Sequence, residues 1–497
     1  MKNSRWRMRP AVITAVGLAI ATGLPAGLAS AQVSAAGTVR PMVKLIAAQK
    51  TINVPRFGKR VFLDTGAYVV AIGQPVRFNV RRAGYAKPLT NTQVISLPGG
   101  GTVRRRLPDR TVMTWRGLHR FFRLTMRNSA GKIVASHVGA FCPNSFAQPS
   151  GLKAPRRSPF PQQCASDPFE LANAWGIQRG WGVDVGFVIA KVPLGKYKVT
   201  VKITKMWQRF LHVTPRGSTV TVTVKVVKPS ECGFPCVGPA SRHHAAPHGT
   251  LPTLPANVPI MAKPPSSSLP DLSALPSWGI RAFHFRGTHP SDQVTFAATV
   301  WSGGQSRLDV EGFRTRGAPV MKAYQYFWRD GRIIGRARAG TMGFDDKPGH
   351  THWHFEQFAQ YRLLAKDKTT IVKSRKVGFC IAPTDAVNLL MRGALWQPSF
   401  LGFFGACGLQ TALSVQEEMP IGWGDTYEQF LPGQAFNISH LPNGTYYIEV
   451  IANPNRVLHE TNYHNNVSLR KIILGGTPGH RTVKVPAVHG IDPEHMG

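Results

Sequence analysis

The chain has 497 residues, 43% of them hydrophobic, so it is long enough for two or three domains with buried cores. This composition excludes a chain that is disordered throughout. The formal net charge of +37 is unevenly distributed, because residues 32–228 carry 32 Lys/Arg against 5 Asp/Glu, whereas residues 229–497 carry 25 against 19. The N-terminal half is therefore the part expected to attract polyanions.

Residues 1–31 predict a secretory signal peptide. Four cationic residues precede an apolar stretch from Ala11 to Leu28, and Ala29-Ser30-Ala31 offers a cleavage site of small residues. The alternative is an uncleaved N-terminal anchor, which the short run and its interruption by Pro25 disfavour. We therefore expect a secreted, extracellular protein with no transmembrane segment in the mature chain.

Six cysteines are compatible with complete pairing in an oxidising compartment. Their positions suggest three local disulfides: Cys142 with Cys164, Cys232 with Cys236, and Cys380 with Cys407. A zinc site is the alternative for Cys232 and Cys236, but the sequence lacks a second ligand pair of matching form.

Short segments rich in Val, Ile and Thr, bounded by Gly and Pro, predict a mainly β protein with two related β-sandwich-like domains. The clearest strands are at 198–204, 218–227 and 445–451. A Pro- and Ser-rich stretch without hydrophobic periodicity predicts a linker between the domains. The expected order is a signal peptide at 1–31, a basic domain at 40–228, the linker at 229–268, a second domain at 269–475 and a flexible tail at 476–497.

The two halves resemble each other in sequence. Trp115 to Cys142 and Trp353 to Cys380 each span 28 residues and end on Phe-Cys. A further cysteine, a Gly-Trp-Gly motif and a Pro-x-Gly-x-Tyr motif follow in both halves in the same order. This order predicts that one domain occurs twice. The alternative is a coincidence of similar β patterns.

Three histidines at alternate positions, His350, His352 and His354, are the strongest local signal for a metal site. Imidazole suits copper, zinc, iron or nickel. In a regular strand, residues i and i+4 lie about 13 Å apart, too far to share one ion. Binding by all three therefore predicts a bend in the backbone. Exposed histidines of an ordinary strand are the alternative.

Several motifs follow the histidines in order: Phe358-Ala-Gln-Tyr-Arg-Leu-Leu364, Lys376-Val-Gly-Phe-Cys380, Asp425-Thr-Tyr427, Pro442-Asn-Gly-Thr-Tyr446 and Glu460-Thr-Asn-Tyr-His-Asn-Asn466. Together with the histidines, they resemble the lysyl oxidase family over about Leu269 to Leu474. The resemblance implies a copper-dependent amine oxidase. It assigns the copper to His350, His352 and His354, and the organic cofactor, a lysine tyrosylquinone, to Lys376 and Tyr427.

A family member of this kind oxidises primary amines, either peptidyl lysine or small amines, to aldehydes. Dioxygen is consumed, and hydrogen peroxide and ammonia are released. The competing function is a non-enzymatic β-sandwich protein that only holds a metal and binds cell-envelope polyanions. A covalent bond between Lys376 and Tyr427 would distinguish the two.

The N-terminal copy lacks the residues that the resemblance implies for catalysis. Val138 aligns with Lys376, Val185 aligns with Tyr427, and no histidine motif surrounds Trp115. We therefore expect this copy to be inert.

The resemblance assigns no general base, because Gln360 stands where many members of the family have a histidine. Glu356 and Asp425 are near the proposed metal and cofactor residues in sequence, and either could accept a proton. Hydrogen-bonding or surface roles are the alternative for both.

The basic half contains a dense cationic stretch at 104–127. Nothing in it resembles a nucleic-acid module, so sequence-specific readout is not expected. An acidic cell-envelope polymer, bound somewhere in residues 40–228, is the preferred partner. A solvated basic face is the alternative.

Overall fold

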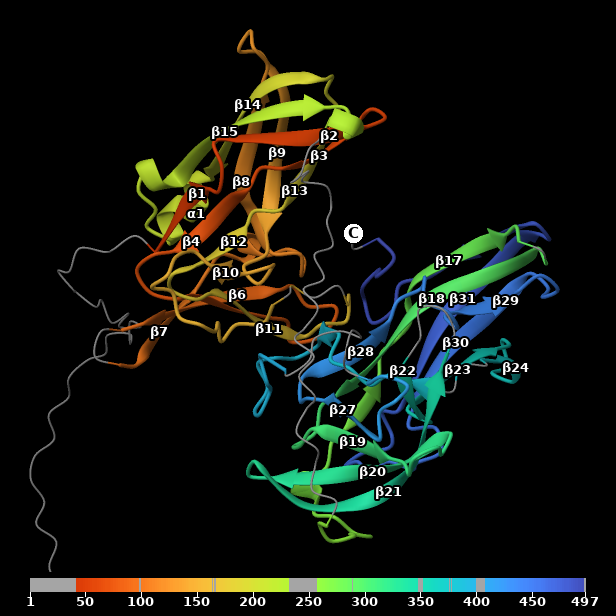
Figure 1. Cartoon of the computed structure of the whole chain (residues 1–497). Coiled ribbons are helices and arrows are strands. Elements are labelled where there is room, and N and C mark those ends of the chain that lie inside the picture. Colours follow the sequence, from red (N-terminus) through yellow and green to blue (C-terminus); the bar gives the residue numbers. More distant parts are fainter. Residues whose placement is uncertain are drawn as a thin grey trace, which may run out of the picture. The chain divides into compact units, whose positions relative to one another are not determined.

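The computed structural model of the chain consists mainly of β-strands, as the sequence predicts (Figure 1). It describes residues 42–97, 100–162, 164, 167–231, 257–287, 289–346, 352–374, 376, 378–398 and 407–495. The α-helix in these ranges is α1 (Lys205–Phe210). No helix in the described ranges is long and apolar enough to span a membrane.

The described part of the N-terminal half forms three sheets. The first contains, in spatial order, β1 (Val43–Ala47), β4 (Ala67–Ala71), β12 (Trp181–Asp184) and β10 (Gln148–Pro149). The second contains β11 (Ala172–Ile177), β5 (Val76–Arg81), β6 (Thr90–Ser96) and β7 (Thr102–Arg106). The third contains β13 (Phe187–Ala190), β3 (Arg60–Asp64), β2 (Thr51–Phe57), β15 (Thr219–Val227), β14 (Gly195–Ile203), β8 (Leu118–Arg127) and β9 (Ile133–Phe141).

The C-terminal half also forms three sheets in its described part. The first contains β16 (Leu272–Ala274), β18 (Ser291–Ser302), β28 (Trp423–Tyr427) and β26 (Asp385–Ala386), with β17 (Trp278–Phe285) and β29 (Ala435–Asn437) also paired to β18. The second contains β25 (Gly378–Phe379), β22 (His352–Glu356), β21 (Arg332–Asp345), β20 (Val320–Arg329), β19 (Leu308–Phe313) and β27 (Ser414–Met419). The third contains β24 (Thr370–Lys373), β23 (Ala359–Leu364), β30 (Gly444–Ala452), β31 (Val467–Thr477) and β32 (His480–Lys484).

The strand orders of the two halves correspond sheet by sheet. The order β1-β4-β12-β10 matches β16-β18-β28-β26, and β11-β5-β6-β7 matches β27-β19-β20-β21. In the third sheet, β9-β8-β14-β15 matches β24-β23-β30-β31. Every one of these pairings is antiparallel in both halves.

Local geometry corresponds at the shared motifs as well. The glycines that open the two Gly-Trp-Gly motifs, Gly180 and Gly422, have φ angles of 76° and 87°. The hydroxyl of Tyr197 donates to the carbonyl of Pro193 at 2.9 Å, and that of Tyr446 donates to the carbonyl of Pro442 at 2.7 Å. The shared sequence markers therefore occupy similar backbone positions.

Each half buries its own apolar cluster, because alternate residues of its strands face inward. The strand β14, for example, buries Tyr197, Val199, Val201 and Ile203 and exposes the lysines between them. Fully buried tryptophans anchor both clusters: Trp175 and Trp207 in the N-terminal half, Trp353 and Trp423 in the C-terminal half.

Disulfides join Cys142 to Cys164 and Cys380 to Cys407, as predicted. Cys232 and Cys236 lie outside the described residues, as do the predicted signal peptide and most of the expected linker. The end of that linker packs on β21, where the amide of Met261 donates to the carbonyl of Arg336 at 2.8 Å.

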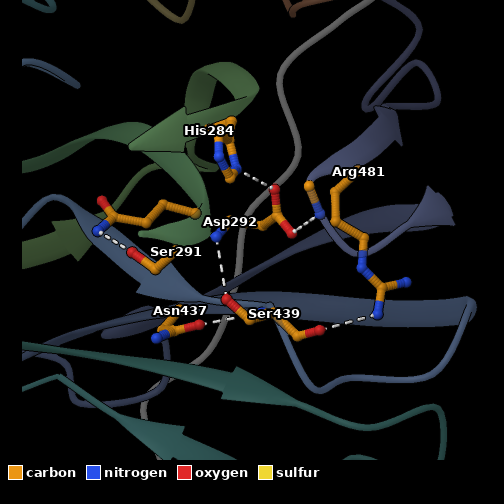
Figure 2. Close-up of polar contacts among 8 residues, drawn as sticks. His284, Ser291, Asp292, Asn437, Ser439 and Arg481 are labelled. Atoms are coloured by element: carbon orange, nitrogen blue, oxygen red, sulfur yellow. Dashed lines mark hydrogen bonds and ion pairs between the residues drawn. The ribbon is translucent and has the colours of Figure 1, made fainter. Parts of the chain in front are cut away.

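The expectation of a flexible tail at 476–497 is wrong for β32, which pairs with the end of β31 across a tight turn. The turn is held by Asp292 of β18 (Figure 2). One carboxylate oxygen of Asp292 accepts from the amide of Gly479 at 2.7 Å, and the other lies 2.9 Å from Nδ1 of His284. Arg481 also donates to the carbonyl of Ser439 at 3.1 Å. Long-range contacts, which a local pattern does not show, thus order this segment.

Candidate active site

Two of the three predicted metal-ligating histidines meet on β22. His352 and His354 are two residues apart, so their side chains lie on the same face of the strand, opposite the buried Trp353 and Phe355. Their Nε2 atoms are 2.9 Å apart. The third histidine, His350, lies outside the described residues.

The pair fits a copper ion by its donor type and spacing. Imidazole nitrogen is a good ligand for copper. Two nitrogens 2.9 Å apart can both bind one ion, because each metal–nitrogen bond is about 2.0 Å long. In the part of the chain that the structure describes, no set of three His, Cys, Asp or Glu side chains comes together at one point. The role of His350 as a third ligand stays a prediction.

The predicted cofactor residues, Lys376 and Tyr427, lie against each other. The Nζ atom of Lys376 is 4.3 Å from the centre of the Tyr427 ring and 4.9 Å from that of Phe379. Tyr427 is the last residue of β28 and is buried, whereas Lys376 is half-buried. The structure thus brings together two side chains that are 51 positions apart in the printed sequence.

An interrupted strand directs Lys376 toward the tyrosine. In the N-terminal half, β9 runs without a break from Ile133 to Phe141 and pairs Val138 with Arg123 of β8. The corresponding segment of the C-terminal half is divided into β24 and β25, which pair with different strands. Lys376 lies between β24 and β25 and belongs to neither strand, whereas the corresponding Val138 is paired within the edge strand β9.

The short strand β25, which follows Lys376 in sequence, pairs with the strand that carries the histidines. Glu356 of β22 pairs with Gly378 of β25, and a Cβ atom at Gly378 would lie 2.8 Å from Cβ of His354. Any residue other than glycine at position 378 would require the backbone or His354 to move. Lys376 therefore lies two positions before the strand residue that packs on His354.

The hydroxyl of Tyr427 is held by the main chain of Cys380, whose amide donates to it at 2.9 Å. Cys380 is fixed in turn by its disulfide to Cys407. The ring of Phe379 meets that of Tyr427 edge to face, with centroids 5.1 Å apart. The tyrosine ring is thus fixed in position beneath the lysine.

Residues 336–482 match the family model for lysyl oxidase, and this range contains His352, His354, Lys376 and Tyr427. The C-terminal region belongs to the lysyl oxidase family. Lysyl oxidase homolog 2 of Bos taurus is 28% identical over 119 residues, 24% of this chain and 13% of that protein. The Homo sapiens protein of that name gives the same values. The Xenopus tropicalis protein is 26% identical over 139 residues, 28% of this chain and 16% of that protein. The match therefore spans a small part of these relatives' length.

Two buried carboxyl groups lie beside the lysine and tyrosine of this lysyl oxidase region. Burial raises the pKa of Asp425 well above its usual range; Glu417 adds to this effect and Lys376 opposes it. Burial also raises the pKa of Glu417, although one of its oxygens accepts from the amide of Ile381 at 2.9 Å. Neither carboxyl oxygen of Asp425 has a hydrogen-bond partner among the described residues. Burial thus favours the protonated form of Asp425.

The other acid considered from the sequence, Glu356, accepts a hydrogen bond from Thr341 at 2.6 Å. It lies on β22, on the same face as His352 and His354. Gln360 accepts from the guanidinium of Arg362 at 3.0 Å. These contacts favour hydrogen-bonding roles for both residues and leave Asp425 as the better proton acceptor.

Sequence reasoning missed a buried polar chain behind β28. The hydroxyl of Thr299 on β18 donates to the carboxylate of Asp167 at 2.7 Å and lies 2.9 Å from the hydroxyl of Thr426. All three residues are buried. Burial, with a contribution from Asp385, raises the pKa of Asp167 to about 7. The sequence drew attention to Asp167 only because acidic residues are rare in the N-terminal half. It did not indicate that Thr299 is its partner.

Proposed function

We propose that the C-terminal region is a copper-dependent amine oxidase whose organic cofactor forms from Lys376 and Tyr427. It would convert primary amines, in peptidyl lysine or small molecules, to aldehydes, with release of hydrogen peroxide and ammonia. The observation that carries this proposal is the distance of 4.3 Å between Nζ of Lys376 and the ring of Tyr427.

His352 and His354 would hold the copper together with His350. When bound, copper with dioxygen supplies the oxidation of the Tyr427 ring that allows the amine of Lys376 to add to it. The chain itself supplies the alignment: the amide of Cys380 holds the tyrosine hydroxyl, and Phe379 packs against the ring edge.

Asp425 would remove the proton that keeps Lys376 from reacting. An ammonium group is not a nucleophile, so the lysine must be neutral before its amine can add to a ring. Asp425 and Tyr427 are two residues apart on β28 and therefore share a face with the lysine above it. Transfer of the proton replaces a buried charge pair by two neutral groups, which burial favours.

We further propose that the protein is exported and that its N-terminal half is a non-catalytic copy of the C-terminal half. The corresponding strand orders and motif geometries support the duplication. Val138 and Val185 stand at the positions of Lys376 and Tyr427, and neither side chain can form the cofactor.

Mass spectrometry of the digested protein tests the enzymatic proposal. After incubation with copper and dioxygen, we expect one cross-linked peptide pair that contains Lys376 and Tyr427, together with amine-dependent release of hydrogen peroxide. Tyr427→Phe and Lys376→Arg should each abolish both signals.

Tyr446→Phe is the matched control, because Tyr446 is also buried but its hydroxyl binds only the carbonyl of Pro442 among the contacts described. This variant should keep the cross-link and the peroxide signal. Two separate, unmodified peptides from the copper-treated wild type would instead favour a non-enzymatic protein that merely holds a metal.

A further inference from the structure

One face of the seven-stranded sheet in the N-terminal half gathers cations. Alternate residues of β14, β8 and β15 pack into the core, so the residues between them point to solvent. Six of these outward residues are exposed lysines or arginines and are called the cationic face below: Lys196, Lys198, Lys202, Arg123, Arg127 and Lys225.

The strand register places like charges directly opposite each other. Lys198 is paired with Arg127, Lys202 with Arg123, and Lys196 with Lys225. Neighbouring strands are about 4.8 Å apart. Like charges at directly opposed positions destabilise a sheet. Three such pairs on one face therefore oppose the folding of this sheet.

No acid of the same sheet region offsets this repulsion. The strands β2, β8, β9, β14 and β15 contain no Asp or Glu. Within the described part of the chain, none of the six cations forms an ion pair. Between the cations lie uncharged hydroxyls such as Thr200 and Thr221, whose oxygens are 3.2 Å apart.

We propose that the cationic face binds an extended polymer with regularly spaced oxyanions, in polyphosphate or polyuronate form. The charges lie on three neighbouring strands, and Lys198 and Lys202 are about 13 Å apart along β14. This spread exceeds the reach of a single small anion and suits a chain with repeating charges. The outward positions of β8, β14 and β15 carry no Phe, Tyr or Trp on which nucleobases could stack.

Charge reversal on the full-length protein tests the assignment, with fluorescent long-chain polyphosphate and polygalacturonate as the two probes. Lys198→Glu combined with Lys202→Glu should weaken binding of at least one probe tenfold or more at low salt. The matched control is Arg104→Glu with Arg110→Glu, which changes the net charge equally at exposed residues outside this face. The control should change affinity less than about twofold. The probe that responds identifies phosphate or carboxylate as the source of the oxyanions.

The double variant Lys198→Thr with Lys202→Thr tests whether weaker binding of the charge-reversed protein could come from misfolding. It removes the opposed charges, so it should unfold at a higher temperature than the wild type while binding the probe more weakly. Binding of the wild type should also weaken progressively as salt is added.

Three results would overturn the proposal. One is wild-type protein that binds neither probe at low salt. Another is equal loss of binding in the face and control variants, because net charge alone would then explain it. The last is tighter binding to single-stranded DNA of equal charge, which would indicate base recognition.

Discussion

At Gly433 a single missing methyl group sets the position of the proposed cofactor lysine. A Cβ atom there would lie 3.1 Å from Cβ and 3.2 Å from Cδ of Lys376. Gly433→Ala should therefore displace the lysine and slow formation of the cross-link with Tyr427 about tenfold or more, as measured by mass spectrometry over time.

Gly317→Ala separates this effect from backbone strain. Gly433 and Gly317 have nearly equal φ angles of 85° and 84°, but nothing lies within 4 Å of a Cβ atom at Gly317. Both variants should lose about 1–2 kcal/mol from strain, and only Gly433→Ala should slow the cross-link. Equal rates in the two variants would refute the steric role.

Asp425 should make the folded state less stable as pH rises. Because its folded-state pKa is raised mainly by burial, the folded protein binds this proton more tightly than the unfolded chain does. The stability that Asp425 contributes is then fully present below the ordinary pKa of 3.8 and is lost as pH rises toward the raised value. Asp425→Asn should exceed the wild type in unfolding free energy at neutral pH, and this difference should vanish near pH 3.

Asp292 should affect the pH dependence of stability in the opposite direction to Asp425. The hydrogen bond from the amide of Gly479, and then the contact with His284, keep the pKa of Asp292 below its usual value (Figure 2). Its stabilisation is present above a pH of about 3.8 and is lost as pH falls through the lowered value. Urea unfolding should show Asp292→Asn to be destabilised at neutral pH, with little difference in strong acid. If both variants responded to pH in the same direction, these assignments would be wrong.

The site residues that the sequence predicts lie in short local motifs, whereas those that it missed act through contacts with residues far along the chain. Lys376 and Tyr427 belong to short ordered motifs whose family resemblance could be read directly. Gly433 and Asp167 have no such motif, because their roles come from contacts with Lys376 and Thr299 far along the chain. Such long-range contacts can be identified only once the complete fold is known.

At the scale of elements, the Cys380–Cys407 disulfide connects stability to the proposed site. It closes a loop with a sequence separation of 27, so its removal should lower the unfolding free energy by about 3–4 kcal/mol. Cys380 also donates its amide to the hydroxyl of Tyr427. The double variant Cys380→Ser with Cys407→Ser should therefore also lower the yield of the Lys376–Tyr427 cross-link in folded protein.

The corresponding disulfide of the N-terminal half is a close control. Cys142 and Cys164 have a sequence separation of 22 and should contribute a similar free energy. Their double replacement by serine should lower the urea midpoint and leave the cross-link yield of folded molecules unchanged. Loss of cross-link in both variants would mean that global stability, rather than the Cys380 contact, limits the reaction.

Strands with clear alternation were predicted best. The expected strands at 198–204, 218–227 and 445–451 correspond to β14, β15 and β30 within a few residues. In contrast, β32 was missed because none of its residues is buried, which gives it no apolar alternation. The division between β24 and β25 was also beyond prediction, since the N-terminal half has a continuous strand at that place.

At the scale of the whole molecule, residues of the two halves share main-chain hydrogen bonds. The amide of Leu171 donates to the carbonyl of Val387 at 2.6 Å, and the amide of Leu389 donates to the carbonyl of Ala172 at 2.8 Å. The proposed duplication therefore did not leave two independent units. The N-terminal half, proposed to be a non-catalytic copy, can therefore support the strands that carry the proposed cofactor residues.

Removing the hydroxyl of Thr299 should test whether the N-terminal half stabilises β28. It joins Asp167 of the N-terminal half to Thr426, whose neighbours on β28 are Asp425 and Tyr427. Thr299→Val keeps the side-chain shape but leaves the buried Asp167 oxygen without this donor, so it should lower the unfolding free energy by about 1–3 kcal/mol. It should also speed hydrogen exchange at the amides of 423–427 about tenfold, because β28 loses its attachment on the face opposite the lysine.

Thr111→Val is the appropriate comparison, since Thr111 is equally buried and its hydroxyl donates to the carbonyl of Pro108 at 2.7 Å, far from β28 in sequence. The two valine variants should lose similar stability in urea, whereas only Thr299→Val should accelerate exchange in β28. If exchange in β28 stayed at the wild-type rate in Thr299→Val, the N-terminal half would contribute no local support to that strand. Because hydrogen exchange needs neither copper nor a cross-link, this result stands whether or not the proposed cofactor forms.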